Sequence, residues 1–420
     1  MTIHPIFEAH DKECQIYQLS NGIRIVHKQV LHTKIAHCGF VLDVGSRDEL
    51  PLQQGLAHFW EHMAFKGTNK RKAFHIINRL ETVGGELNAY TTKEKICFYA
   101  SVLTPHFEKA VELLKDITFD SIFPENQIER ERNVILEEMA MYQDSPDDAL
   151  QDEFDAQIFQ NHSLGNNILG TTESVESFDR QHFHQFIQEN VDTHRIVFAS
   201  LSQLPFEQVI KKVEKYLAPI PEKRSHKKRI TFESYQPQIV EKGYHTKQAY
   251  CAIGRTAYSL YDEKRLAFVL LINILGGPGM NSRLNLQLRE KHGWVYAVEA
   301  SYTPFVDTGL LAIYFNTERK HLNKSLNAVM KEMQLLQEQP LGTTQLHQAK
   351  EQLMGQLAMA EENHLNFMLM MAKSVLDLGR VTALEAIFEE IKLLEQDKIQ
   401  QVAQEIFDPA QMSKLIYLPE

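Results

Sequence analysis

The chain has 420 residues, 43% of them hydrophobic and 24% charged, which is typical of a soluble globular protein with about two to four domain-sized units. A formal net charge of -11 without a basic face argues against a nucleic-acid-binding protein. The longest apolar stretch, near residues 266–275, is too short for a membrane-spanning helix, which needs about 20 residues.

The N-terminal residues 1–11 contain neither a basic region nor an apolar core, so we expect no secretory signal peptide. The four cysteines lie in apolar or alternating runs and form no C-x-x-C pair; they are Cys14, Cys38, Cys97 and Cys251. This pattern favours buried, reduced thiols over a disulfide framework or a thiolate metal site. We therefore expect a cytoplasmic protein.

Strand-like and helix-like apolar patterns follow one another through the first half of the chain. Alternating runs at residues 14–19 and 23–26 flank Asn21-Gly22 and predict a β-hairpin. Further strand-like runs lie at residues 35–44 and 87–103. Apolar periodicity predicts helices over residues 54–66, 73–83, 105–117 and 125–141.

Two features mark the middle of the chain. Ser145-Pro146-Asp147-Asp148 is typical of a capping box with proline at the first helical position, which predicts another helix start. Between residues 217 and 238 the pattern breaks around a basic cluster, Lys223, Arg224, Lys227, Lys228 and Arg229. We interpret this segment as a solvated linker, with a nucleic-acid-binding patch as the alternative.

The second half of the chain repeats the pattern of the first. A strand-like pair ends at Tyr99 and a helical run begins at Lys109; Tyr314 and Lys324 mark the same features later in the chain. The offset from Tyr99 to Tyr314 equals the offset from Lys109 to Lys324. A strand and a helix at a fixed offset predict a duplicated α+β unit. We predict an N-terminal domain over residues 1–218, a linker over 219–238 and a C-terminal domain over 239–420.

The segment from His58 to His62 reads H-x-x-E-H, a pattern suited to metal chemistry. On a helix, His58 and His62 are four residues apart, share a face and can reach one ion. Glu61 borders the same face and is placed to take a proton from metal-bound water. The alternative is a pair of core or surface histidines, because a short motif can arise by chance in a chain with 19 histidines.

A catalytic zinc site usually has three protein ligands and a water molecule, so a third ligand is required. At 100° per residue, the helix predicted over 125–141 has a core-facing stripe of Ile128, Ile135 and Met139. Glu131 and Glu138 lie together about 60–80° from that stripe, and Glu137 lies on the opposite face. Glu138 is therefore the candidate ligand, and Glu131 could hydrogen-bond a ligand histidine or the water. The alternative is that all three are ordinary surface charges.

With these residues in view, the chain resembles the pitrilysin, insulinase and mitochondrial processing peptidase family, the inverzincins. Residues 55–68, which contain the H-x-x-E-H motif, are very close to the family motif. The resemblance implies that the third zinc ligand is the second glutamate of a Glu-Glu pair. Glu138 matches it and follows His62 at the spacing that the family has. The family also has an important glutamate seven residues earlier, which matches Glu131.

The same resemblance implies roles in substrate binding. Residues 84–94 resemble the family's active-site edge strand, where an extended substrate pairs with backbone groups near Asn88 and Ala89. Arg289 and Tyr296 resemble the family's Arg/Tyr pair, which holds substrate and polarises the scissile carbonyl. From the residues alone, a surface arginine and a core tyrosine are the alternatives. Two departures from the family pattern, Trp60 and His292, put the shape of the subsites in doubt.

The resemblance covers nearly the whole chain and implies an α+β fold. It implies two similar domains, each a mostly antiparallel sheet with helices packed on one face. The chain has the length of the short bacterial members, which pair as clamshells around a chamber. Because this chain carries both the zinc motif and the Arg/Tyr pair, we expect a homodimer, with no nucleic acid or membrane partner.

These observations predict a zinc-dependent metalloendopeptidase with one zinc ion per chain. It would hydrolyse peptides or unfolded segments in an enclosed chamber, with Glu61 activating zinc-bound water and Tyr296 helping zinc to stabilise the oxyanion. One alternative is a non-catalytic family subunit that binds peptides or stabilises a partner. Another is a metal-binding protein without peptidase activity. Non-catalytic relatives usually lose a ligand or the base, whereas all four positions are present here.

Overall fold

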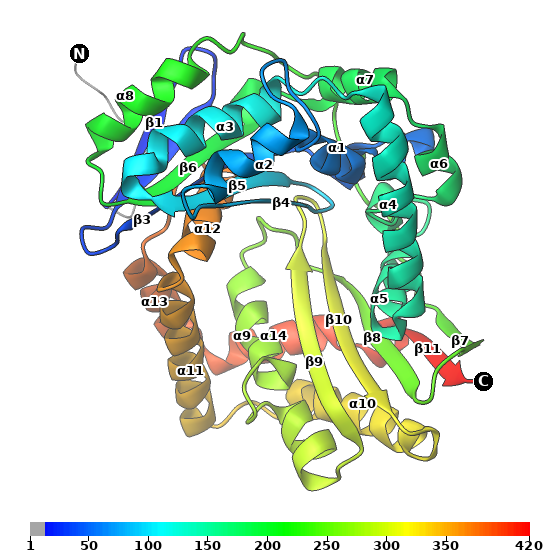
Figure 1. Ribbon diagram of the computed structural model, residues 1–420. Helices are drawn as coiled ribbons and strands as arrows, with labels where there is room; N and C mark the ends of the chain where they lie inside the picture. The colour runs from blue at the N-terminus through cyan, green and yellow to red at the C-terminus, as the bar shows by residue number, and fades with distance from the viewer. Residues whose placement is uncertain (1–12) are drawn as a thin grey trace. The chain divides into compact units, whose positions relative to one another are not determined.

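The computed structural model describes residues 13–420 (Figure 1). The segment 1–11, on which the expectation of no signal peptide rests, lies outside the described residues. Within residues 13–420, no helix is long and apolar enough to cross a membrane. The chain divides into two units, each containing one sheet and several helices.

The first unit is built on a six-stranded sheet. Its strands, in spatial order, are β1 (Cys14–Gln18), β2 (Arg24–Gln29), β6 (Ile196–Ser202), β3 (Ile35–Leu42), β5 (Ile96–Leu103) and β4 (Glu86–Thr91). Strands β2 and β6 are parallel, and the other neighbouring pairs are antiparallel. The predicted hairpin is formed by β1 and β2, and Gly22 in its turn has a φ of 93°, which favours glycine. The sheet leaves β4 at one edge.

Helices cover both faces of this first sheet. One face carries α1 (Leu56–Ala64), α2 (Ala73–Glu81), α3 (Phe107–Phe119) and α8 (Phe206–Leu217) (Figure 1). Successive strand residues point to opposite faces: Phe40 contacts Phe119 of α3, while Val41 belongs to an apolar cluster with Met371. Met371 belongs to α12 (His364–Leu378), which therefore covers part of the opposite face.

The second unit repeats this topology. Its five strands, in spatial order, are β7 (Ile239–Tyr244), β11 (Ser413–Pro419), β8 (Ala249–Ala257), β10 (Gly309–Thr317) and β9 (Val295–Pro304). The order and directions match those of β2, β6, β3, β5 and β4, with β7 and β11 as the parallel pair. Strand β7 follows β2 along the chain at the predicted offset, and α10 (Leu322–Glu338) follows α3 at the same offset. The predicted duplication and the α+β fold class are therefore confirmed, but helices cover both faces of the first sheet rather than the one face expected.

The second sheet is also covered by helices. Leu150 and Phe154 of α5 (Pro146–Ile158) pack in an apolar cluster with Ala252 and Leu415. Helix α9 (Arg265–Gly276) packs on β9, and α14 (Gln396–Ile406) packs on α9 and α10. The remaining helices are α4 (Glu125–Asp144), α6 (Thr172–Ser177), α7 (Arg180–Asn190), α11 (Thr343–Glu361) and α13 (Leu384–Leu393).

The two units differ from the predicted domains, which were continuous over residues 1–218 and 239–420. Residues 140–165 belong to the second unit, and residues 358–387 belong to the first. The physical reason is that each half of the chain supplies a helix to the other sheet: α5 packs in the second core and α12 in the first. Periodicity identifies such a helix but does not say which sheet it covers.

The predicted linker, residues 219–238, is anchored rather than solvated along its length. Its residues up to Arg229 belong to the first unit. The Arg229 guanidinium bonds to the carboxylates of Asp43 and Asp48, and Lys223 donates to the Ile187 carbonyl. Two members of the basic cluster are therefore bonded within the first unit rather than solvated.

Two smaller expectations have different outcomes. All four cysteines are buried and none forms a disulfide, as expected. Helix α5 begins at Pro146 as predicted, but the Ser145 side chain makes no capping hydrogen bond. Asp148 occupies the third helical position, where a capping box uses the longer glutamate or glutamine.

Candidate metal centre

Helix α1 carries the H-x-x-E-H motif, and its start is sterically fixed. Gly55 precedes the helix with a φ of 93°, and an added Cβ there would lie 2.4 Å from the Leu169 carbonyl oxygen. Only glycine meets both requirements without strain. The apolar residues between the histidines, Phe59 and Trp60, are fully buried. The buried residues fix the rotation of α1 about its axis and with it the direction of the polar side chains.

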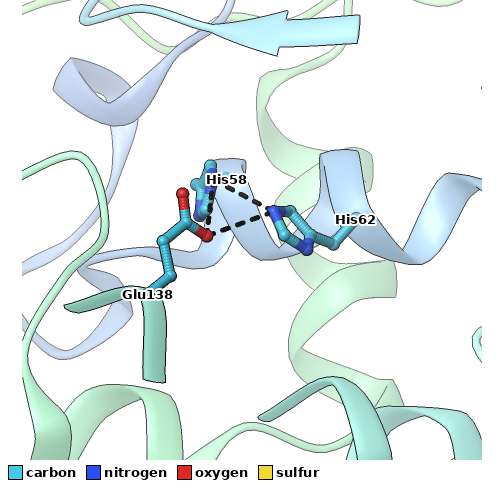
Figure 2. Close-up of side chains that lie close together, drawn as sticks. All are labelled: His58, His62 and Glu138. Atoms are coloured by element: carbon cyan, nitrogen blue, oxygen red, sulfur yellow. Dashed lines mark hydrogen bonds and ion pairs between the residues drawn. The ribbon is translucent and has the colours of Figure 1, made fainter. Parts of the chain in front are cut away.

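The side chains of His58, His62 and Glu138 point toward one another (Figure 2). The two Nε2 atoms are 3.2 Å apart, and Oε2 of Glu138 lies 3.6 Å from Nε2 of His62 and 3.9 Å from Nε2 of His58. Within residues 13–420, these three form the one group of at least three such side chains whose ligand atoms all lie within 4.8 Å of one another. The convergence expected from the sequence is thus present, and all three residues belong to the first unit.

The orientation of α4 agrees with its helical register. Ile128, Ile135 and Met139 are buried, Glu137 is exposed, and the Glu138 side chain is 24% exposed. Glu138 therefore lies at the edge of the core, where its carboxylate can reach a partly buried ion. Burial raises the pKa of Glu138, the Glu131 charge adds to this, and the charge of His62 opposes it.

The geometry and chemistry of this group fit a zinc ion. Zinc in proteins takes imidazole nitrogens and carboxylate oxygens at about 2.0–2.2 Å in tetrahedral geometry, which separates two ligands by about 3.3 Å. The separations of 3.2, 3.6 and 3.9 Å are close to that edge length. Two imidazoles and one carboxylate also leave a fourth position open, as catalytic zinc sites do.

Glu131 orients the His62 ring. Its Oε1 atom lies 2.9 Å from Nδ1 of His62, and its Oε2 atom lies 2.6 Å from Nζ of Lys66. Burial raises the pKa of Glu131, but the hydrogen bonds from His62 and Lys66 outweigh burial and lower it below its ordinary value. An ionised Glu131 accepts the Nδ1 proton, which leaves the Nε2 lone pair of His62 free to bind a metal.

Burial keeps the His58 ring neutral. Burial, followed by the nearby charge of His62, lowers the pKa of His58 to about 3. Its Nε2 lone pair is therefore available at neutral pH. Its Nδ1 atom is buried and has no hydrogen-bond partner within the part of the chain that the structure describes. Unlike His62, His58 has no side chain that orients its ring.

Glu61 lies beside the metal-ligand group and is held by β4. The Thr91 hydroxyl donates to Oε2 of Glu61 at 2.7 Å. Burial raises the pKa of Glu61; the Thr91 hydrogen bond and the His62 charge lower it, and the Glu138 charge raises it. A carboxylate whose pKa is raised toward neutrality is a suitable general base.

Replacing Thr91 with valine is expected to change how kcat/KM for the predicted peptide cleavage depends on pH. The acidic limb of that pH profile should move to higher pH. Valine keeps the shape of threonine but removes the hydrogen bond that favours ionised Glu61, so the pKa of Glu61 rises. Glu61 then stays protonated to a higher pH and cannot accept a proton. A loss of about 10-fold in kcat/KM is expected on the acidic limb, below the pKa of Glu61, from removal of one bond to a charged group. A profile identical to that of the wild type would contradict this role of Thr91.

The family follows from comparison with known proteins. The model named Insulinase (Peptidase family M16) matches residues 24–172, and the model named Peptidase M16 inactive domain matches residues 177–353. An uncharacterized zinc protease of Bacillus subtilis, YmxG, is 31% identical over 391 residues, which are 93% of this chain and 95% of that protein. This chain belongs to the insulinase family. An uncharacterized zinc protease of Rickettsia bellii is also 31% identical, over 96% of this chain and 97% of that protein.

Solved structures share the fold of this chain. A structure described as a peptidase M16 inactive domain from Pseudomonas fluorescens superposes with a TM-score of 0.87 at 17% identity, over 97% of this chain and 98% of that one. A protease from Helicobacter pylori superposes with a TM-score of 0.87 at 18% identity, over 97% of this chain and 99% of that one. At these identities the likeness concerns the fold alone.

Asn88 and Ala89, expected from the family to bind substrate, lie on the edge strand β4. Strand β4 pairs with β5 on one side and ends the sheet on the other. The Ala89 N–H donates to the side-chain oxygen of Asn88 at 2.8 Å. An extended peptide that added to this edge would exchange that contact for backbone pairing. Thr91, the partner of Glu61, is two residues further along the same strand.

Arg289 and Tyr296 belong to the second unit. Arg289 lies in the helical segment Asn285–Lys291, with its side chain 42% exposed and 3.7 Å from Glu290. Tyr296 is the second residue of β9 and is 85% exposed. The alternative of a core tyrosine is therefore wrong, whereas a surface arginine describes Arg289 correctly. Their roles in substrate binding stay predictions.

The two departures from the family pattern, Trp60 and His292, are not among the three converging side chains. Trp60 is 1% exposed and packs its ring near Phe98 and Phe186, so it fills the core of the first unit. His292 stacks on Trp294 with ring centroids 4.1 Å apart. Trp60 is therefore a core residue of the first unit. It affects core packing rather than the shape of a substrate subsite.

Sequence reasoning missed two residues of this centre. Lys66, which holds Glu131, lies four residues after His62, and that spacing could have identified it. Thr91, which holds Glu61, lies 30 residues further along the chain, where no local pattern connects it to α1. Its contact depends on how β4 packs beside the helix.

Proposed function

We propose that this chain is a zinc-dependent metalloendopeptidase that binds one zinc ion through His58, His62 and Glu138. The convergence of these three side chains, with Glu61 beside them, is the observation that carries the proposal. Membership of the insulinase family and the zinc proteases among its relatives support it.

Each residue has a distinct part in the proposed reaction. When bound, a zinc ion lowers the pKa of a water molecule to about 7 and polarises the scissile carbonyl. Glu61 would accept a proton from the attacking water and deliver it to the leaving amine. Thr91 keeps the Glu61 carboxylate in place, and Glu131 with Lys66 keeps the His62 ring turned toward the ion.

The substrate class follows from the edge strand. A peptide in extended form can pair with β4 near Asn88 and Ala89, whereas a folded segment cannot offer a free strand. We therefore propose peptides and unfolded segments as substrates. We also propose, from the family resemblance, that they are cleaved in an enclosed chamber of a homodimer. Arg289 and Tyr296 would bind the substrate. A cytoplasmic location belongs to the same proposal and rests on the four free thiols.

Removal of the metal is expected to abolish cleavage of an unfolded polypeptide. The chain would be treated with a strong zinc chelator, freed of it and assayed with and without added zinc, with metal content measured by mass spectrometry. Loss of cleavage and its recovery with about one equivalent of zinc are expected, because the three ligands define one site. Full cleavage by protein shown to be metal-free would refute the proposal. The same polypeptide in folded form should be cleaved far more slowly.

A further inference from the structure

Glu49 is a buried carboxylate that bonds to the start of α1. The N–H groups of Gly55 and Ala57 donate to its Oε2 and Oε1 atoms at 3.0 Å and 2.7 Å, and Glu49 is 6% exposed. The first N–H groups of a helix lack partners within it, and the side chain of the N-cap residue usually accepts one of them. The N-cap of α1 is Gly55, which has no side chain. Glu49 supplies the missing acceptor from six residues upstream.

The backbone before Glu49 is itself fixed. Asp48 accepts the Gly45 N–H at 2.9 Å and two bonds from the Arg229 guanidinium, at 2.9 Å and 2.8 Å. Arg229 also donates to Asp43 at 2.8 Å. Glu49 therefore extends from a loop that a buried, bidentate ion pair holds in place.

The start of α1 is held from its other side by residues 169–174. The close approach of the Leu169 carbonyl to Gly55 leaves no room for a side chain, and the Ser174 hydroxyl donates to the Gln54 carbonyl at 2.6 Å. Residues 54–57 therefore lie between two fixed segments. The first turn of α1 cannot shift without breaking a contact to Glu49 or to Ser174.

His58 depends on this first turn more than His62 does. Ala57, whose N–H bonds to Glu49, directly precedes His58. The His62 ring is oriented by Glu131, whereas Nδ1 of His58 has no hydrogen-bond partner among residues 13–420. We propose that Glu49 is a positioning residue for His58: its carboxylate fixes the first turn of α1 and so directs the His58 ring toward the shared ligand point. This inference rests on the proposed zinc function.

A purely structural role for Glu49 makes a different prediction. Burial raises the pKa of Glu49 well above its ordinary value, and the two N–H bonds and the Lys93 charge oppose this. Glutamine has the size of glutamate, but its NH₂ group would face one of the two N–H donors. Glu49→Gln therefore breaks one of the two bonds whatever the protonation state of Glu49. If Glu49 only stabilised the fold, this change would lower the melting temperature and leave zinc affinity unchanged.

Asp179→Asn is the matched control. Asp179 caps α7 in the same unit, and its carboxylate accepts the N–H groups of Gln181 and His182. The zinc dissociation constant would be measured by competition with a chromophoric chelator. Hydrogen exchange of residues 55–58 would be measured on the metal-free chain, together with kcat, KM and melting temperature. We expect Glu49→Gln to weaken zinc binding by about 10–100-fold and to speed hydrogen exchange of residues 55–58. We also expect kcat to fall by a larger factor than the factor by which KM changes. Asp179→Asn keeps the Oδ1 atom that accepts both N–H groups, so it should leave zinc affinity, exchange, kcat and KM at their wild-type values.

Each outcome decides the inference. Wild-type zinc affinity in a folded Glu49→Gln chain would overturn it, as would an equal loss of affinity in Asp179→Asn. If Glu49→Gln does not fold, Glu49→Asp keeps the carboxylate with a shorter reach. A zinc affinity of folded Glu49→Asp below that of the wild type supports the inference, and a wild-type affinity overturns it. A wild-type chain that binds no zinc would refute the proposed function and the inference with it, a result distinct from the other two.

Discussion

Replacing Glu61 with glutamine is expected to lower kcat/KM for peptide cleavage by about 10²–10⁴-fold, the usual contribution of a general base. Zinc content should stay at the wild-type level, because Glu61 is not one of the three converging ligands. Glutamine keeps the size of glutamate and an oxygen that can accept the hydrogen bond from the Thr91 hydroxyl. In the wild type this hydroxyl lies 2.7 Å from Oε2 of Glu61. The amide cannot accept the proton of the attacking water. The measurement is initial rates over a range of peptide concentrations, paired with metal analysis of the same samples.

The exposed Glu81, at the end of α2, provides the control substitution. Glu81→Gln removes the same charge from the same unit and should cleave like the wild type. If Glu61→Gln cleaved the peptide as fast as the wild type, Glu61 could not be the general base. A wild-type chain that binds zinc and peptide but cleaves none would instead favour the non-catalytic family subunit.

Local features of the structure could be predicted from local patterns. Asn21-Gly22 identified the β1–β2 hairpin because a short turn with glycine at its left-handed position, here Gly22, is specified by its own residues. The register of α4 separated Glu138 from Glu137 because the apolar stripe alone fixes which side of a helix faces the core. The strand and helix patterns that recur at a fixed offset identified two similar sheets, because each copy of the pattern specifies the strands and helices of one unit.

Features that depend on tertiary packing could not be predicted. The sequence of α12 shows an apolar helix, but the identity of the sheet it covers depends on a core assembled from distant strands. Thr91 and Glu49 reach α1 through side-chain hydrogen bonds that no spacing rule anticipates. The H-x-x-E-H motif and the register of α4 thus identify the candidate ligands, while the residues that hold them become visible only in the folded chain.

Replacing Glu138 with glutamine is expected to weaken zinc binding by more than about 100-fold, beyond the usual cost of losing an outer-shell partner. A carboxylate offers both a strong oxygen donor and a negative charge, whereas the neutral amide offers only a weaker donor. His58 and His62 would then hold the ion with two imidazoles alone. Competition with a chromophoric chelator would measure the affinity, and cleavage should fall in proportion to the zinc lost.

Glu137→Gln tests whether this effect belongs to the ligand or only to the charge of α4. Glu137 is the neighbouring residue, carries the same charge and is exposed, so its loss should leave zinc affinity and cleavage unchanged. Adjacent helical residues point about 100° apart, so the two substitutions differ in the direction of the side chain rather than in chemistry. An equal loss of affinity in both variants would show that negative charge near the site, and not a bond from Glu138, controls zinc binding.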